Sequence, residues 1–179
     1  MLLKVPGNPK TLVATGGKQA IFDIVEADSG KYAFSFDLGV QDVVIGIDPK
    51  TGAKQINPRL IPGGGDTITT CPHAGGAKNW LPESYNSDSK VMFITLVEAC
   101  MDLVPVAPGG RGSLSTGVRW TVRPRPDTDG KYGRLEAFNL ETKKSLWKMR
   151  QRAPMSTGVL ATAGGRGVDR KSTRLNSSH

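Results

Sequence analysis

The chain has 179 residues, a formal net charge of +8 and 37% hydrophobic residues, which fits one globular domain. Its longest apolar run, Val91–Val97, is far shorter than the roughly 18 residues that a membrane helix needs, so no membrane span is predicted in this segment. The basic residues alternate with Asp and Glu and do not interleave with aromatic residues. This pattern argues against a nucleic-acid partner.

The 22 glycines and 12 prolines interrupt helical periodicity almost everywhere, whereas short apolar runs typical of strands are common. Turn signals such as Asp28-Ser29-Gly30 separate these runs. Many short strands at this spacing are typical of an all-β sandwich, barrel or propeller. The predicted strands are Thr11–Thr15, Gln19–Glu26, Tyr32–Asp37, Val43–Asp48, Val91–Ala99, Gly117–Val122, Arg134–Asn139, Ser145–Arg150 and Val159–Ala163.

An internal repeat favours the propeller. In three segments an Asp-like residue is followed by Thr or Ser, then by a turn position that suits Gly, and the segment ends on a large apolar residue. Each copy is expected to form a strand, a tight turn and a second strand, with the polar side chains bonding turn N–H groups. In the third copy Lys143 replaces the glycine. The copies are Ile24–Phe34, Gly46–Ile56 and Ala137–Trp147.

The third copy resembles the tryptophan-docking motif of the quinoprotein alcohol dehydrogenases. A more specific resemblance runs from Cys71-Pro72-His73-Ala74-Gly75-Gly76-Ala77-Lys78-Asn79-Trp80-Leu81-Pro82-Glu83-Ser84-Tyr85 to Cys100-Met101-Asp102. It is similar to the C-P-x-A-x-G-G-x-N-W-x-P-x-S-Y and C-M-D signature of members that depend on pyrroloquinoline quinone (PQQ). The resemblance implies an eight-bladed β-propeller of the quinoprotein alcohol dehydrogenase type.

The length implies only part of such a propeller. Eight blades of roughly 40–45 residues need about 350 residues, so residues 1–168 are predicted to be a partial, interior propeller domain of about three to four blades. Residues 169–179 resemble translated sequencing-adapter sequence, and the alternative is a basic, disordered tail. The family's general-base aspartate and Ca²⁺ ligands are then expected upstream of residue 1.

The resemblance assigns cofactor-binding roles to Lys18, Asn79 and Trp80. Lys18 aligns with the family's basic residue at the quinone oxygens, the Asn79 amide can bond a cofactor oxygen, and the Trp80 indole can form a flat apolar wall. The alternatives are a solvated strand-edge lysine, a turn-forming asparagine and a tryptophan that packs between blades. Ser156 stands where many relatives carry a tryptophan, so one cofactor contact of the family is in doubt here.

The two cysteines, Cys71 and Cys100, permit one disulfide or two free thiols. The corresponding pair in some family members is disulfide-bonded, which would suit a periplasmic enzyme. No metal site is predicted within the chain, because His73 is the only nitrogen ligand near these cysteines.

The resemblance therefore implies a fragment of a periplasmic PQQ-dependent dehydrogenase, with its signal peptide expected upstream. It would oxidise an alcohol or a sugar and pass electrons to a cytochrome c or a quinone, and without the upstream base it would be inactive alone. The alternative is a non-enzymatic β-propeller scaffold of the outer-membrane assembly type. A scaffold has no reason to keep a cofactor loop, so the segment around Asn79 and Trp80 favours the enzyme.

Overall fold

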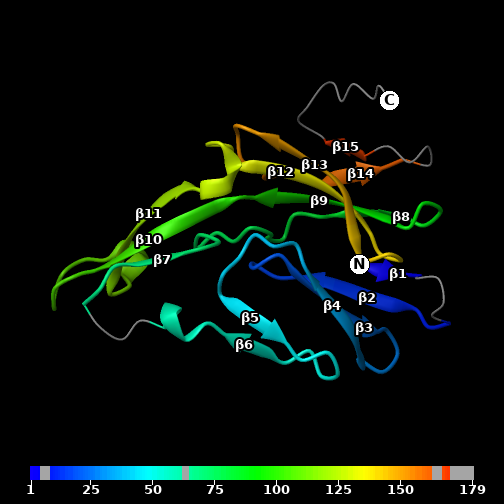
Figure 1. Cartoon of the computed structure of the whole chain (residues 1–179), viewed down its shortest axis with the longest axis horizontal. Helices are drawn as coiled ribbons and strands as arrows, with labels where there is room; N and C mark the ends of the chain where they lie inside the picture. Colours follow the sequence, from blue (N-terminus) through cyan, green and yellow to red (C-terminus); the bar gives the residue numbers. More distant parts are fainter. Residues whose placement is uncertain (5–8, 62–64, 163–166, 170–179) are drawn as a thin grey trace.

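The computed structural model describes residues 1–4, 9–61, 65–162 and 167–169, and confirms the all-β prediction (Figure 1). These residues form two four-stranded sheets, one three-stranded sheet and two two-stranded sheets, with neighbouring strands antiparallel. The first sheet is β1 (Leu2–Leu3), β2 (Leu12–Gly16), β3 (Ile21–Glu26) and β4 (Tyr32–Asp37), and the second is β8 (Ser84–Asn86), β9 (Val91–Val97), β12 (Gly133–Asn139) and β13 (Lys144–Gln151). The others are β7 (Ile68–Thr70), β10 (Ala99–Pro105) and β11 (Val118–Pro124), β5 (Val44–Ile47) with β6 (Lys54–Ile56), and β14 (Val159–Ala161) with β15 (Gly167–Asp169). Three short 3₁₀ turns are η1 (Pro58–Leu60), η2 (Ser113–Ser115) and η3 (Pro126–Thr128).

The two four-stranded sheets pack against each other through one apolar core. Phe36 of the first sheet stacks on Phe138 of the second, with ring centroids 4.3 Å apart. The central strand β9 is buried on both faces, because Met92, Ile94 and Leu96 enter this core while its other face packs in a second cluster. A strand covered on both sides reads as a continuous apolar run, which explains its sequence. The second cluster is Val91, Phe93, Leu135, Ala137, Met155 and Val159.

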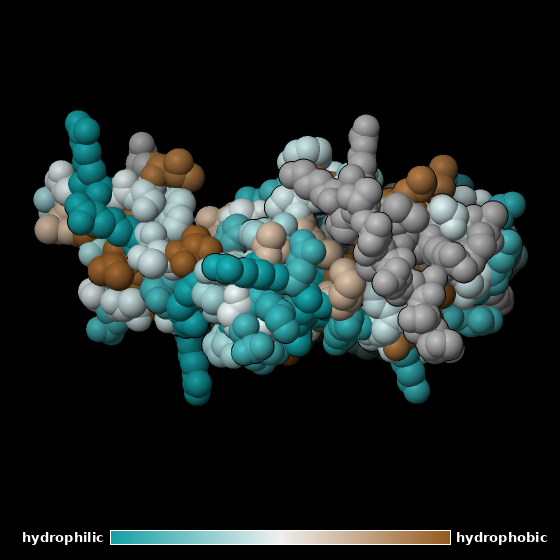
Figure 2. Space-filling view, turned by 90° about the horizontal axis from the view of Figure 1, so that it is seen from above, coloured by the Kyte–Doolittle hydropathy of each residue, from teal (hydrophilic) through white to brown (hydrophobic). Residues whose placement is uncertain are grey.

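The three-stranded sheet extends to one end of the molecule (Figure 1). Val104, Leu114 and Val122 on and beside β10 and β11 are exposed. At that end, the face seen in Figure 2 carries separate apolar patches between hydrophilic side chains.

All three repeat copies form the predicted hairpins, β3–β4, β5–β6 and β12–β13. In the second turn, Asp48 Oδ1 accepts hydrogen bonds from the backbone N–H groups of Lys50 and Thr51, both at 2.8 Å. Asn139 Oδ1 plays the same part in the third turn. Lys143 adopts a φ of +56°, close to the +75° of Gly52 at the matching position, so the third turn keeps its shape without a glycine.

The predicted strand Val91–Ala99 is wrong at its end. β9 stops at Val97, and a new strand, β10, begins at Ala99 in a different sheet. Between them the Glu98 backbone bonds to Tyr132 and Arg125, which diverts the chain from one sheet to the next. Cys100 therefore lies near the start of β10 rather than at the end of β9.

The other predicted strands are present, with ends that differ by at most about two residues, while Ala163 lies outside the described residues. β10 and the short strands β1, β7, β8 and β15 were not predicted, and β6 was expected only as the second strand of the repeat copy Gly46–Ile56. The proposed domain boundary at residue 168 stays a prediction, because β15 spans it and residues 170–179 lie outside the described part of the chain.

Candidate functional site

A pocket of about 340 Å³ lies beside the loop that follows β7, at the lower end of the size range of small-molecule sites. The loop forms one wall, β9 contributes Thr95 and Val97, and a segment before β14 closes the other side. The lining residues on the loop and the closing segment are His73, Gly75, Gly76, Ala77, Asn79, Trp80, Leu81, Pro154, Met155 and Ser156.

Hydrogen bonds within the loop fix two of the predicted cofactor residues. Asn79 Nδ2 donates to the Gly75 carbonyl oxygen at 2.9 Å, and Asn79 Oδ1 accepts from the Trp80 N–H at 2.9 Å. The Trp80 residue is 82% exposed, so its indole is not a core side chain of this chain. Asn79 thus shapes the loop, and Trp80 offers an accessible aromatic face at the pocket.

Lys18, the third predicted residue, lies against the same loop. Its ammonium donates to the Ala74 carbonyl oxygen at 2.8 Å, and its own carbonyl oxygen accepts from the Ala77 N–H at 2.8 Å. A Cβ at Gly76, where φ is +85°, would lie 2.8 Å from the Lys18 Cβ, so a glycine is required there for this close approach. Lys18 backs the loop but is not among the residues that line the pocket.

A buried ion pair, which the sequence analysis did not predict, stabilises the end of the loop that precedes β8. Lys78 is 4% exposed, and its ammonium lies 3.0 Å from a carboxylate oxygen of Glu83. The same ammonium donates to the carbonyl oxygens of Asn79 (2.9 Å) and Leu81. Lys78 therefore ties together the residues on both sides of Trp80. A lysine between a glycine pair and Asn-Trp gives no sequence signal that it is buried.

The base of the loop is linked to the three-stranded sheet. Cys71 and Cys100 form a disulfide across 29 residues of sequence, and Thr70 and Met101, next to them, are paired in register between β7 and β10. The His73 N–H donates to the Ala99 carbonyl oxygen at 2.8 Å. The loop therefore starts from a covalently and hydrogen-bonded base.

Ser156 lines the pocket from the opposite side. The segment that carries it is fastened to β9, because Thr95 Oγ1 donates to the Thr157 carbonyl oxygen at 2.8 Å. It is fastened to the loop as well, since the Val159 N–H donates to the Pro82 carbonyl oxygen at 3.2 Å. A small hydroxyl side chain occupies this wall of the pocket, at the position where the resemblance implied a tryptophan.

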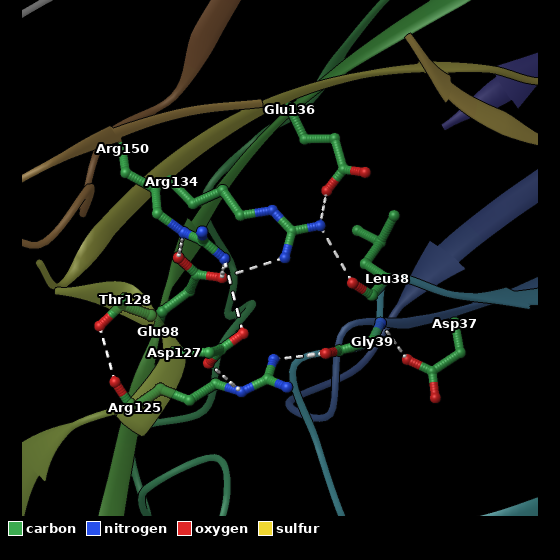
Figure 3. Close-up of polar contacts among 10 residues, drawn as sticks. All are labelled: Asp37, Leu38, Gly39, Glu98, Arg125, Asp127, Thr128, Arg134, Glu136 and Arg150. Atoms are coloured by element: carbon green, nitrogen blue, oxygen red, sulfur yellow. Dashed lines mark hydrogen bonds and ion pairs between the residues drawn. The ribbon is translucent and has the colours of Figure 1, made fainter. Parts of the chain in front are cut away.

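Beyond the end of β9 lies a charged cluster in which Glu98, Arg134 and Glu136 are buried and the other members are partly or largely exposed (Figure 3). Glu98 accepts hydrogen bonds from Arg134 at 3.1 Å and from Arg150 at 2.6 Å. Arg134 also pairs with Glu136 and donates to the Leu38 carbonyl oxygen at 3.0 Å. Nearby, Arg125 pairs with Asp127 and donates to the Gly39 carbonyl oxygen. The cluster thereby joins the second sheet to the loop after β4.

Two opposing effects set the charge of Glu98. Burial raises its pKa, but hydrogen bonds from Arg150 and Arg134 outweigh that effect and hold the pKa below its ordinary value. Glu98 therefore stays ionised between its arginine partners. The sequence analysis did not predict this cluster, because its members are distant in the chain and Glu98 directly follows the apolar strand β9.

A larger cavity of about 610 Å³ lies between η1 and β7. Residues 62–64, which connect its walls, lie outside the described residues. None of the predicted site residues lines it, so we assign it no function.

Among the described residues, no group of three or more His, Cys, Asp or Glu side chains is placed to hold a metal ion. No helix in the described part of the chain is long and apolar enough to cross a membrane.

Comparison with known proteins identifies relatives over nearly the whole chain, although no protein-family model matches it. The chain is 30% identical over 169 residues to lupanine 17-hydroxylase [cytochrome c] of a Pseudomonas species, covering 91% of this chain and 23% of the relative. It is 27% identical over 167 residues to the quinoprotein alcohol dehydrogenase PedH of Pseudomonas putida, covering 88% and 27%. The chain thus spans about a quarter of the length of these curated relatives.

Solved structures agree on the fold. The quinohemoprotein alcohol dehydrogenase of Comamonas testosteroni superposes with a TM-score of 0.76 at 20% identity, over 94% of this chain and 26% of that one. A europium-containing methanol dehydrogenase superposes with a TM-score of 0.77 at 16% identity, over 93% and 30%. These matches confirm the prediction of a partial β-propeller of the quinoprotein alcohol dehydrogenase type.

Proposed function

The chain is homologous to a segment of the quinoprotein alcohol dehydrogenases, and on this premise we propose that it belongs to a PQQ-dependent dehydrogenase. In this proposal the pocket beside the loop that follows β7 binds one side of the quinone. The observation that carries this proposal is the placement of Asn79 and Trp80 on the pocket wall, with Lys18 directly behind the loop.

The residues of the loop offer the groups that a flat, oxygen-rich molecule needs. Trp80 presents an accessible indole face for stacking. The Asn79 amide donates one of its two N–H hydrogens to the Gly75 carbonyl oxygen, and the second can donate to a ligand. Lys18 bonds one carbonyl oxygen through Nζ, and its charge favours negative charge on a ligand nearby. PQQ, when bound, supplies the quinone that accepts a hydride from the substrate.

We propose an alcohol or a sugar as the substrate and a cytochrome c or a quinone as the electron acceptor. The printed name of one relative, lupanine 17-hydroxylase [cytochrome c], supports a cytochrome acceptor. The Cys71–Cys100 disulfide supports an oxidising compartment such as the periplasm. We place the Ca²⁺ ligands and the general base outside the described residues.

Equilibrium dialysis of the 179-residue chain against PQQ tests this proposal. We expect saturable binding that weakens at least about tenfold in Trp80→Ala, because the stacking face is lost. Trp120→Ala is the matched control, because Trp120 lies on β11 and does not line the pocket. Absence of binding, or equal loss in both variants, would contradict the proposal and favour a non-enzymatic scaffold.

A further inference from the structure

The pocket contains a group to which neither the proposed function nor the comparisons give a role, the imidazole of His73. Its ring lines the same cavity as Asn79 and Trp80, and it is partly buried. The chain has only two histidines, His73 and His179, so this ring can be observed almost in isolation.

The hydrogen bonding of the ring determines where its proton lies. His73 Nδ1 accepts a hydrogen bond from the Gly75 N–H at 2.7 Å. A nitrogen that accepts a hydrogen bond carries a lone pair, so the neutral ring carries its hydrogen on Nε2. Among the described residues, the one side-chain hydrogen bond of His73 is that at Nδ1, and Nε2 is not among the buried atoms that lack a partner. The Nε2–H group is therefore accessible and can donate to a molecule in the pocket.

The backbone holds this donor in place. The His73 N–H donates to the Ala99 carbonyl oxygen, and the His73 carbonyl oxygen accepts from the Gly76 N–H, both at 2.8 Å. The ring lies over Gly75, where an added Cβ would come within 2.3 Å of the His73 Cε1 atom. A side chain at residue 75 would therefore displace the ring, and the glycine leaves room for it.

The surroundings keep the ring uncharged at neutral pH. Burial lowers the pKa of His73 below its ordinary value, and the positive charge of Lys18 lowers it further. A neutral ring with a fixed tautomer donates one hydrogen bond in one direction. Such a donor suits a carbonyl or carboxylate oxygen of a ligand.

We propose that His73 is a further ligand-binding residue, whose Nε2–H group donates a hydrogen bond to an acceptor oxygen of the molecule in this pocket. The inference rests on the proposed function, in which that molecule is PQQ, with carbonyl and carboxylate oxygens as acceptors. His73 then fixes the orientation of the ligand, while Trp80 contributes contact area.

Two substitutions separate the donor from the bulk of the ring. His73→Met keeps an extended side chain without a donor, whereas His73→Gln retains an N–H group near the position of Nε2. In equilibrium dialysis we expect PQQ affinity to fall about tenfold in His73→Met and no more than about threefold in His73→Gln. Equal affinity of wild type and His73→Met would overturn the inference and leave the proposed function standing. Failure of the wild-type chain to bind PQQ would overturn both.

Nuclear magnetic resonance on the intact ring gives a readout that does not depend on a destabilising substitution. In ¹⁵N-histidine-labelled His179→Gln, the one histidine signal belongs to His73. Long-range ¹H–¹⁵N correlations should show the hydrogen on Nε2, and the Nε2 signal should shift when PQQ is added. A hydrogen on Nδ1, or an Nε2 signal unchanged by saturating PQQ, would overturn the inference.

Discussion

The ammonium of Lys18 donates a hydrogen bond at 2.8 Å to the carbonyl oxygen of Ala74, 56 residues further along the chain. A second hydrogen bond joins the same two segments, from the Ala77 N–H to the Lys18 carbonyl oxygen at 2.8 Å. The turn between β2 and β3 thus supports the loop that forms one wall of the pocket. This link joins the first sheet to the candidate cofactor site.

Loss of the Lys18 ammonium should loosen that loop. We expect Lys18→Met to raise the amide hydrogen-exchange rates of Gly75 and Gly76 several-fold, because the side-chain bond to Ala74 is lost. The strand amides of β9 should exchange as in the wild type. Lys50→Met, at an exposed lysine in the β5–β6 turn, is the control. Equal rates in the wild type and Lys18→Met would show that the ammonium does not hold the loop.

Removing the Lys78 ammonium should lower the free energy of unfolding far more than removing the ammonium of an exposed lysine that also pairs with a glutamate. Lys78→Met leaves the Glu83 carboxylate and two carbonyl oxygens without their buried partner, and we expect a loss of about 3 kcal/mol in the free energy of unfolding.

Urea denaturation measures this loss. Lys10→Met is the matched control, because Lys10 pairs with Glu26 at 2.6 Å on the exposed surface, where such pairs contribute little. Similar losses in the two variants would contradict the bracing role of Lys78.

The buried cluster predicts acid sensitivity. The pKa of Glu98 is lower in the folded chain than its ordinary value, which is about 4.3, so the unfolded chain takes up this proton at a higher pH. Glu98 therefore contributes stability above about pH 4.3, and this contribution is lost as the pH falls through its folded-state pKa. Thermal melts at stepwise lower pH should show the decline.

Glu98→Gln should flatten part of that acid dependence and cost about 3 kcal/mol at neutral pH, because Arg134 loses a buried ionic partner. Glu141→Gln, at an exposed residue of the β12–β13 turn, should leave both the stability and its pH dependence unchanged. An acid profile that is the same in the wild type and Glu98→Gln would rule out Glu98 as the source.

Two glycines at the same repeat position separate backbone strain from steric overlap. Gly30 and Gly52 both have a positive φ, +68° and +75°. An added Cβ meets nothing within 4 Å at Gly30, but at Gly52 it would lie 2.5 Å from the Tyr32 ring. Gly30→Ala should cost about 1 kcal/mol, and Gly52→Ala clearly more. Equal losses in chemical denaturation would mean that Tyr32 does not pack on this turn.

The sequence pattern predicted those features that depend on neighbouring residues, namely the hairpins and the loop at the pocket. The three hairpins followed from turn chemistry, since Asp48 and Asn139 bond the turn backbone in the same way. The motif placed Asn79 and Trp80 on one loop, and they are found together at the pocket.

What the sequence did not reveal depends on contacts between distant residues. The burial of Lys78 and the contacts of Glu98 with Arg134 and Arg150 exist only after the sheets pack. The tautomer of His73 depends on a backbone N–H two residues away and on the ring conformation, which no spacing rule predicts.

The proposal as a whole is tested most directly by activity. The protein encoded by the reading frame extended in both directions should be assayed for dye-linked oxidation of alcohols and sugars, with and without PQQ and Ca²⁺. We predict activity that requires PQQ and falls in Lys18→Ala and Asn79→Ala. A folded protein that shows neither PQQ binding nor PQQ-dependent oxidation would contradict the account and leave a propeller that serves as a binding scaffold.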